Sequence, residues 1–481
     1  MSRISRVFQR FPRAFWVANT MELLERWSWY GMFMVLALYL TGSIDTGALG
    51  FTQSQKGMLM GSVVALLYVL PVFTGALADR FGYRSTLIIA YLILATGYYL
   101  MGQVNTYLAM YLVFVWVAIG AALFKPVIAA TVSKTTDDLT SSIGFGIFYL
   151  MVNLGAFIGP VFASRFRLLS WEWVFNMSAL VILVNLLLVL FFFRMPVLKV
   201  EKRPLLQELR TVLLNIYEAL RDFRFLVFLL LIIGFWTMYN QLFYTLPVFI
   251  DQWVDTSSVY RMIAGVSPAL ARSLGTPEGT IPPELMTNID AMYIVLLQIL
   301  VSWWVMRFKP LNAMIGGIFI SSIGIGLSFM FNDGIFLFAT ILVFALGEMA
   351  SSPKITEYVG KIAPEGKTAL YIGASFLPVA GGNFFAGLLS GGTYTRMADK
   401  IHLLQLEVSK RGLDIQAPSE SFSSNAYLQA AADAMGMDQA GLTQFLWESY
   451  QPYQIWMVFT GIGVSTAVLL WLYDRLWLSR A

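Results

Sequence analysis

Long runs of apolar residues, separated by short polar segments, make up most of the chain between residues 14 and 477. Each run has about 20 residues, the length that an α-helix needs to cross the hydrocarbon part of a bilayer. The pattern therefore predicts twelve membrane-spanning helices. Their expected limits are residues 14–40, 57–78, 85–103, 108–130, 140–164, 170–194, 225–250, 288–307, 312–332, 335–360, 368–390 and 452–477.

Three of the connections between these runs are long. Residues 195–224 carry leucines at helical spacing with charges between them, which predicts an amphipathic helix at the membrane surface. Residues 251–287 contain four prolines and predict an irregular external loop, whereas residues 391–451 are polar and predict an external segment that is partly helical. We therefore expect an N-terminal bundle over 1–194, a cytoplasmic linker, and a C-terminal bundle over 225–481 that carries both external loops.

Composition supports this fold class. Of the 481 residues, 58% are hydrophobic and only 12% are charged, and the mean hydropathy is +0.69. A soluble domain has about 25% charged residues, which it needs to cover its surface. The composition excludes a water-soluble enzyme, a disordered chain and a collagen-like chain, and it indicates an all-α polytopic membrane protein.

Charge and reactive residues exclude further classes of function. The net charge of +4 gives no basis for nucleic-acid binding. The absence of cysteine and the single histidine, His402, leave no set of side chains for a disulfide, a metal site or a histidine-based catalytic triad, so we expect no enzyme. Lysine and arginine are concentrated in alternate connections, most of all in 195–224. This bias predicts a multi-pass protein of the cell (inner) membrane with both termini in the cytoplasm.

The first apolar run contains three ionisable residues, Glu22, Glu25 and Arg26. Spacings of three and four place them on one helical face. One guanidinium cannot neutralise two carboxylates, so one glutamate is either protonated or paired with another helix. Burial and a neighbouring like charge both favour the protonated form of a carboxyl group. The residues predict a site of proton exchange, and the alternative is a neutralised lock between helices.

Two more ionisable residues lie deep in apolar runs, where a charge is costly. Lys125 precedes Pro126, a residue that kinks a helix and leaves a carbonyl without its donor. A buried ammonium group such as that of Lys125 needs a carboxylate partner, which Glu22, Glu25 or a substrate could supply. The alternative to a functional role is a permanent ion pair between helices. Glu348 has no basic residue within the preceding or following turn of its predicted helix.

Polar and amphipathic side chains also occur on otherwise apolar helices. Together they offer donors, acceptors and ring faces for a polar organic ligand. Trp236, taken alone, is equally typical of a core aromatic residue. These residues are Tyr68, Tyr149, Asn153, Trp236, Asn240, Gln241 and Asn288.

Several short motifs occur in order along the chain. They are ELLERWSWYG (22–31), Tyr68 with Pro71 and GALADRFG (75–82), the pair Lys125 and Pro126, FYLMVNLGAFIGP (148–160), GFWTMYNQ (234–241), GEMASSP (347–353) and GGNFFAG (381–387). With these motifs the chain resembles the proton-dependent oligopeptide transporter family, the peptide transporters of the major facilitator superfamily. The similarity extends over nearly all the predicted spans.

The resemblance implies the major facilitator fold, with twelve helices in two six-helix bundles and the ligand bound between them. It implies proton-coupled import of di- and tripeptides by alternating access, driven by a proton gradient without a cofactor, in a protein that acts as a monomer. The implied proton-coupling residues are Glu22, Glu25, Arg26 and Glu348. The implied substrate-binding residues are Tyr30, Tyr68, Lys125, Asn153, Trp236, Gln241, Asn288 and Glu348. Asp79 and Arg80 would tie helices together.

Two departures from the family pattern bear on the substrate. Phe33 stands where most members have an arginine that helps hold the substrate carboxylate, so Lys125 would act alone, and Asn240 stands where an acidic residue is usual. An alternative function is therefore transport of a non-peptide solute, such as an amine, an amino acid or a drug, inward or outward. A membrane-embedded enzyme or a receptor is a weaker alternative, because neither needs a buried proton site.

Overall fold

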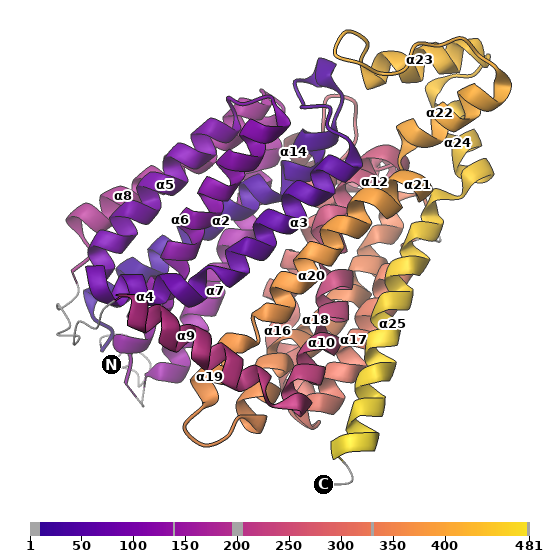
Figure 1. Cartoon of the computed structure of the whole chain (residues 1–481). Helices are drawn as coiled ribbons and strands as arrows, with labels where there is room; N and C mark the ends of the chain where they lie inside the picture. Colours follow the sequence, from indigo (N-terminus) through magenta and orange to yellow (C-terminus); the bar gives the residue numbers. More distant parts are fainter. Residues whose placement is uncertain (1–9, 138–139, 195–204, 329–330, 479–481) are drawn as a thin grey trace. The chain divides into compact units, whose positions relative to one another are not determined.

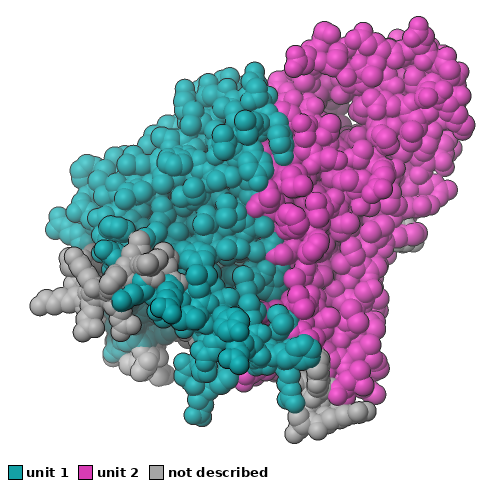
Figure 2. All heavy atoms as spheres, in the orientation of Figure 1, with its two compact units in different colours: residues 1–33, 63–226, 363–380 teal, residues 34–62, 227–362, 381–481 magenta. Residues whose placement is uncertain are grey.

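The computed structural model describes residues 10–137, 140–194, 205–328 and 331–478. Within these ranges the regular structure is helical and includes no strand. The chain divides into two compact units: unit 1 comprises residues 1–33, 63–226 and 363–380, and unit 2 comprises residues 34–62, 227–362 and 381–481 (Figure 2). The boundaries between the units fall inside helices, so the predicted division of the chain at residues 195–224 stays a prediction.

Unit 1 is built mainly from helices that precede residue 226. Within it α5 packs against α6 and α8, and α4 packs against α6 and α9 (Figure 1). Its helices are the first part of α2 (Arg13–Thr41), the last part of α3 (Gln53–Val69), α4 (Pro71–Phe81), α5 (Tyr83–Met101), α6 (Tyr107–Lys134), α7 (Ser141–Arg167), α8 (Trp171–Phe191), α9 (Leu205–Leu220), α19 (Thr368–Ala374) and the start of α20 (Leu377–Leu388).

Unit 2 holds most of the later helices. In it α17 packs against α18 and α25, and α16 packs against α18. Figure 1 shows α22, α23 and α24 gathered together beyond one end of α25. Its helices include α10 (Phe223–Tyr239), α11 (Gln241–Tyr244), α12 (Leu246–Trp253), α13 (Ser257–Val266), α14 (Pro268–Leu274), α15 (Pro283–Thr287), α16 (Ile289–Val305), α17 (Pro310–Leu327), α18 (Gly334–Ile362), α21 (Tyr394–Met397), α22 (Lys400–Arg411), α23 (Ser424–Ala434), α24 (Gln439–Tyr450) and α25 (Ile455–Tyr473).

Eleven helical segments among the described residues are long and apolar enough to cross a membrane. Helix α2 is not one of the eleven, although its 29 residues make it long enough. The ionisable residues Glu22, Glu25 and Arg26 lower its hydropathy. Counting α2 as a span gives the predicted twelve, and the prediction of an all-α polytopic membrane protein is confirmed.

Three runs that we predicted as single helices are interrupted. The second run forms α3 and α4, the seventh forms α10, α11 and α12, and the eleventh forms α19 and α20. Three of the four interruptions lie next to a proline in the first turn of the following helix: Pro71, Pro247 and Pro378. The fourth, between α10 and α11, falls at Asn240. Proline has no N–H to continue the preceding helix, but its fixed φ suits the start of a new one.

The long connections are more ordered than the sequence indicated. The expectation that 251–287 is irregular was wrong, because it contains α13, α14 and α15. Its prolines begin helices; at α14, Ser267 accepts a hydrogen bond from the N–H of Leu270, and Pro268 follows it. The predicted helix within 195–224 is α9, whereas residues 195–204 lie outside the described part of the chain. Residues 391–451 are partly helical, as predicted.

Candidate functional site

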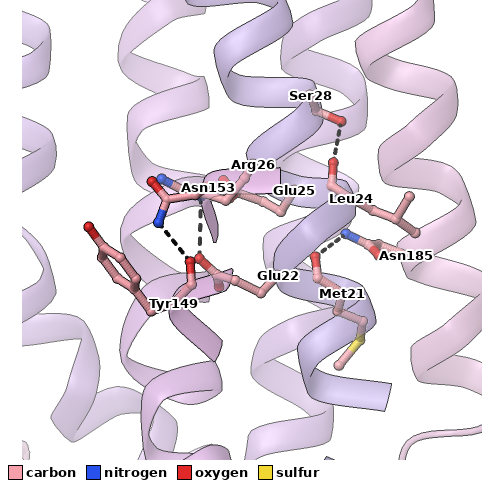
Figure 3. Close-up of polar contacts among 9 residues, drawn as sticks. All are labelled: Met21, Glu22, Leu24, Glu25, Arg26, Ser28, Tyr149, Asn153 and Asn185. Atoms are coloured by element: carbon pink, nitrogen blue, oxygen red, sulfur yellow. Dashed lines mark hydrogen bonds and ion pairs between the residues drawn. The ribbon is translucent and has the colours of Figure 1, made fainter. Parts of the chain in front are cut away.

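The predicted cluster on α2 forms as its spacing indicates. Arg26 Nε lies 2.6 Å from Glu25 Oε2 and 3.4 Å from Glu22 Oε1, and a terminal nitrogen of Arg26 also pairs with Glu25 (Figure 3). Glu25 is completely buried, and its second oxygen, Oε1, has no donor among the described residues. One guanidinium therefore serves two buried carboxyl groups, and one carboxyl oxygen is left over.

Close packing of α7 against α2 encloses this cluster. A Cβ atom placed on Gly155 would lie 2.7 Å from Arg26 Cβ and 3.1 Å from Trp27 N, and one on Gly159 would lie 2.7 Å from Gly31 N. Small residues four apart let two helices in a membrane approach this closely. The same helix carries Asn153, whose amide Nδ2 donates to the Tyr149 carbonyl at 2.8 Å (Figure 3).

Lys125 is held over an aromatic ring. Its Nζ lies 4.5 Å from the centroid of the half-buried Tyr68 ring, a cation–π geometry. It interacts electrostatically with Glu22 and Glu25, yet no carboxylate lies within 4.0 Å of it in the described ranges. The direct ion pair that the sequence suggested is therefore absent from this arrangement, and the donors of Lys125 remain available to an acceptor.

The proline beside Lys125 has the consequence expected of it. Because Pro126 has no N–H, the carbonyl of Ala122 loses its helical donor. The hydroxyl of Thr74 on α4 donates to this carbonyl at 2.6 Å. This bond fastens α4 to α6 one turn before Lys125. Both helices also meet at Asp79, which accepts from Tyr83 at 3.1 Å and lies 4.0 Å from Lys134.

Asp79 on α4 thus contacts residues of α5 and α6, and its role in the loop motif stays a prediction. Arg80, its neighbour, is exposed at the end of α4. Tyr30 is half-buried one turn beyond Arg26, with which it interacts electrostatically.

In unit 2, Glu348 lies among aromatic residues. The Tyr239 hydroxyl donates to Glu348 Oε1 at 2.9 Å, and the Tyr239 ring stacks on Phe344 with a centroid distance of 5.9 Å. Trp236, half-buried, meets Tyr239 edge-on at 5.2 Å, and its indole Nε1 has no acceptor among the described residues. Trp236 is therefore a ring with an unused donor rather than a fully packed core residue.

The amides of the seventh run are used locally. Gln241 is completely buried; its Nε2 donates to the Thr237 carbonyl at 3.1 Å, and its Oε1 accepts from Thr245 at 2.5 Å. Asn240 Nδ2 donates to the Trp236 carbonyl at 2.7 Å. Because these groups are occupied, we leave Gln241 out of the proposed site. Asn288, buried at the start of α16, remains a candidate.

Lys56 and Asp290 are two of the buried ionisable residues that escaped the sequence analysis, and Glu284 and Glu407 are others. Lys56 on α3 is completely buried, and its Nζ donates to the carbonyl of Tyr244 at 3.0 Å. Asp290 on α16 is 4% exposed and lies within hydrogen-bonding reach of Glu348. Each stands near the start of a predicted span, where a charge normally reaches water.

The sequence profile of the Major Facilitator Superfamily matches residues 20–254. An uncharacterized transporter, YclF, of Bacillus subtilis is 31% identical over 31% of this chain and 31% of its own length. A dipeptide and tripeptide permease A of Erwinia pyrifoliae is 30% identical over 38% of this chain and 37% of its own length. The alignments to these two relatives thus span about a third of their length. A crystal structure of a POT family transporter in complex with a thioalcohol-conjugated peptide is similar with a TM-score of 0.71 and 16% identity, over 98% of this chain and 99% of that one.

Residues 20–254 are thus similar in sequence to the major facilitator superfamily. The sequence similarity to a peptide permease and the similarity of fold to a POT family transporter confirm the resemblance to peptide transporters drawn from the motifs. In a chain with this resemblance, the buried cluster on α2 is a candidate for coupling, because charged residues inside membrane helices commonly mark proton or substrate sites.

Proposed function

We propose that this protein is a proton-coupled symporter that imports di- and tripeptides, or peptide-like zwitterions, by alternating access. The observation that carries the proposal is the buried cluster of Glu22, Glu25 and Arg26, with Lys125 acting on it electrostatically but not in direct contact. Two carboxylates and two cations balance when no ligand is bound. A ligand carboxylate that engages Lys125 disturbs this balance by one negative charge, and a proton on Glu22 or Glu25 restores it.

The ligand chemistry follows from what the two units offer. Lys125 would bind the carboxylate of a zwitterion, beside Tyr68, Tyr30 and Asn153. Glu348 would accept hydrogen bonds from the ammonium group, aided by Asn288. The Trp236 ring and its unused Nε1 would contact the peptide itself. Peptide-like ligands suit these groups better than an amine or a neutral drug, which offers no carboxylate to Lys125.

We further propose that the protein acts as a monomer in the cell (inner) membrane, with both termini in the cytoplasm. The alternating distribution of lysine and arginine in the connections supports this orientation. The proton gradient takes the place of a cofactor, because one proton moving inward yields about 2.3 kcal/mol per 100 mV of membrane potential. That free energy is sufficient to concentrate a peptide roughly fiftyfold at 100 mV.

The test is uptake of a labelled dipeptide into proteoliposomes under an imposed proton gradient. We expect concentrative uptake that stops when a protonophore is added. Glu25→Gln should abolish accumulation, whereas the matched control Glu172→Gln, at an exposed position on α8, should not. Unlabelled dipeptides should compete with the label, and free amines should not. Accumulation that survives Glu25→Gln or the protonophore would contradict the coupling scheme.

A further inference from the structure

Two carboxyl groups face one another inside unit 2. Asp290 on α16 and Glu348 on α18 are 4% and 9% exposed, and their side chains lie within hydrogen-bonding reach of each other. The two helices pack together along their length. The contact is therefore a fixed feature of the helix pair rather than an encounter of mobile side chains.

No hydrogen bond can join two ionised carboxylates, because neither carries a hydrogen atom. Asp290 Oδ1 and Glu348 Oε2 are buried and have no other donor among the described residues. A single proton placed between the two groups forms a hydrogen bond that joins them. It also removes the repulsion between two like charges, which is strong where water is excluded.

The surroundings offer no other means of neutralising the pair. No lysine or arginine lies within 4.0 Å of either carboxylate in the described ranges. The Tyr239 hydroxyl is a neutral donor and reaches only Glu348 Oε1, at 2.9 Å. Tyr293, on the same helix as Asp290, donates instead to the Phe338 carbonyl at 3.1 Å. Glu284, on the adjoining α15, is itself acidic and cannot supply a positive charge.

The titratable groups named here are thus the two carboxyls, the neutral phenols Tyr239 and Tyr293, and a further acid. The lysines of α18, Lys354 and Lys361, pair with Glu357 instead, at 2.6 Å and 2.7 Å. A metal ion is a poor alternative, because the described residues contain no group of three or more side chains suited to hold one. A proton is the occupant that fits this buried pair of carboxyl groups. One proton leaves the pair with a single negative charge.

We propose that Asp290 and Glu348 share one proton and form a proton-carrying pair in unit 2, with Asp290 as a coupling residue of the transporter. This inference rests on the proposed function for the coupling and on geometry alone for the shared proton. In the loaded state an O–H bond on one carboxyl donates to the other. On release that O–H bond breaks, the proton goes to water, and two carboxylates remain.

Infrared difference spectroscopy of the purified full-length protein tests the shared proton without any transport. We expect the C=O band of a buried carboxylic acid at neutral pH in the wild type. Asp290→Asn and Glu348→Gln should each remove it, and Asp414→Asn, at an exposed position in the same unit, should leave it unchanged. Adding sodium at constant pH should also leave it unchanged. Absence of the band, its survival in Asp290→Asn, or its loss with sodium would overturn the proposal.

Transport tests the coupling. In proteoliposomes, Asp290→Asn should retain dipeptide exchange under counterflow while its proton-driven accumulation falls about tenfold or more, to near equality of the two sides. The asparagine amide can donate to Glu348, so the variant should fold with wild-type thermal stability, and Glu348→Gln provides a second test if it does not. Full accumulation in Asp290→Asn would refute the coupling role. If the wild type transports no dipeptide, the proposed function fails while the infrared result still decides the pair.

Discussion

Lys56 Nζ donates a hydrogen bond to the main-chain carbonyl of Tyr244 at 3.0 Å, although Lys56 is completely buried. The Tyr244 hydroxyl in turn donates to Asn383 at 3.0 Å and to the Met60 carbonyl at 3.2 Å. The Tyr394 ring lies 5.3 Å from Lys56 Nζ. Tyr244 therefore contacts α3 at two positions, Lys56 and Met60. At the first of them the contact is made by a buried basic side chain.

Replacing Lys56 with methionine should raise the thermal stability of the protein. Among the described residues no carboxylate lies within 4.0 Å of this lysine, so burial is costly whether it keeps its charge or gives up its proton. The cost of burying an ion is several kcal/mol, whereas the lost hydrogen bond contributes about 1 kcal/mol. Thermal unfolding in detergent measures the difference, with the exposed Lys309→Met as the matched control. A lower melting temperature for Lys56→Met alone would show that the hydrogen bond dominates.

Gly57→Ala should destabilise the contact between α3 and α20. A Cβ atom at Gly57 would collide with the Gly387 carbonyl and lie 2.8 Å from Gly391 N. These are backbone atoms, which cannot rotate away as a side chain can. We therefore expect the free energy of unfolding to fall by about 1–3 kcal/mol, the usual cost of overpacking, or by more. Gly461→Ala is the matched control, because a Cβ atom there meets open space. Equal melting temperatures for the two variants would contradict the close approach.

Substitutions at Tyr68 separate its ring from its hydroxyl. Lys125 Nζ lies 4.5 Å from the ring centroid, and the ring face attracts a cation without help from the hydroxyl. Tyr68→Phe should therefore leave the KM for dipeptide uptake within about twofold, whereas Tyr68→Leu should raise it by a factor that reflects about 0.5–2 kcal/mol. A large effect of Tyr68→Phe would instead assign the role to the hydroxyl.

Asp45 makes the attachment of α23 dependent on pH. Partial burial raises the pKa of Asp45, but hydrogen bonds from Ser43 and from Asn425, at 3.0 Å, outweigh it and hold the pKa below its usual range. Because the pKa of Asp45 is lower in the folded state, its hydrogen bonds contribute their full stability above the unfolded-state pKa of about 3.9. This stability is lost as the pH falls through the lower pKa of the folded state. Protection of residues 424–434 from hydrogen exchange should decrease only on acidification below that range.

The variant Asp45→Asn should reduce this protection at neutral pH and remove most of its dependence on acid. Asp414→Asn, at an exposed position within residues 391–451, should behave as the wild type. Protection that decreases in parallel in all three proteins would point to general acid unfolding instead.

The parts of the fold that depend on length and periodicity could be predicted from the sequence. The apolar runs gave the spans, and the spacing of Glu22, Glu25 and Arg26 gave their common face. The partners across helices could not be predicted, because periodicity fixes a face but not the helix that packs against it. Pro126 indicated a carbonyl without a donor, yet only the structure identifies Thr74 as its partner.

Asp290 and Lys56 were missed for a related reason. The predicted spans began at residues 288 and 57, so each side chain counted as a charge at a span end. In the structure the corresponding segments begin earlier, at Pro283 and Gln53. A shift of one helical turn in a boundary is enough to turn a solvated charge into a buried one.

Gly155 and Gly159 have a mechanical consequence for the buried cluster on α2. Backbone pressed against backbone leaves no room for α7 and α2 to slide, because any displacement along the axis brings larger neighbours into the groove. The two helices must therefore move together as one rigid body during any rearrangement. Asn153 then keeps a constant distance from Glu22 and Arg26. Under the proposed function, the event that triggers movement would be a change of charge rather than a change of shape within this pair.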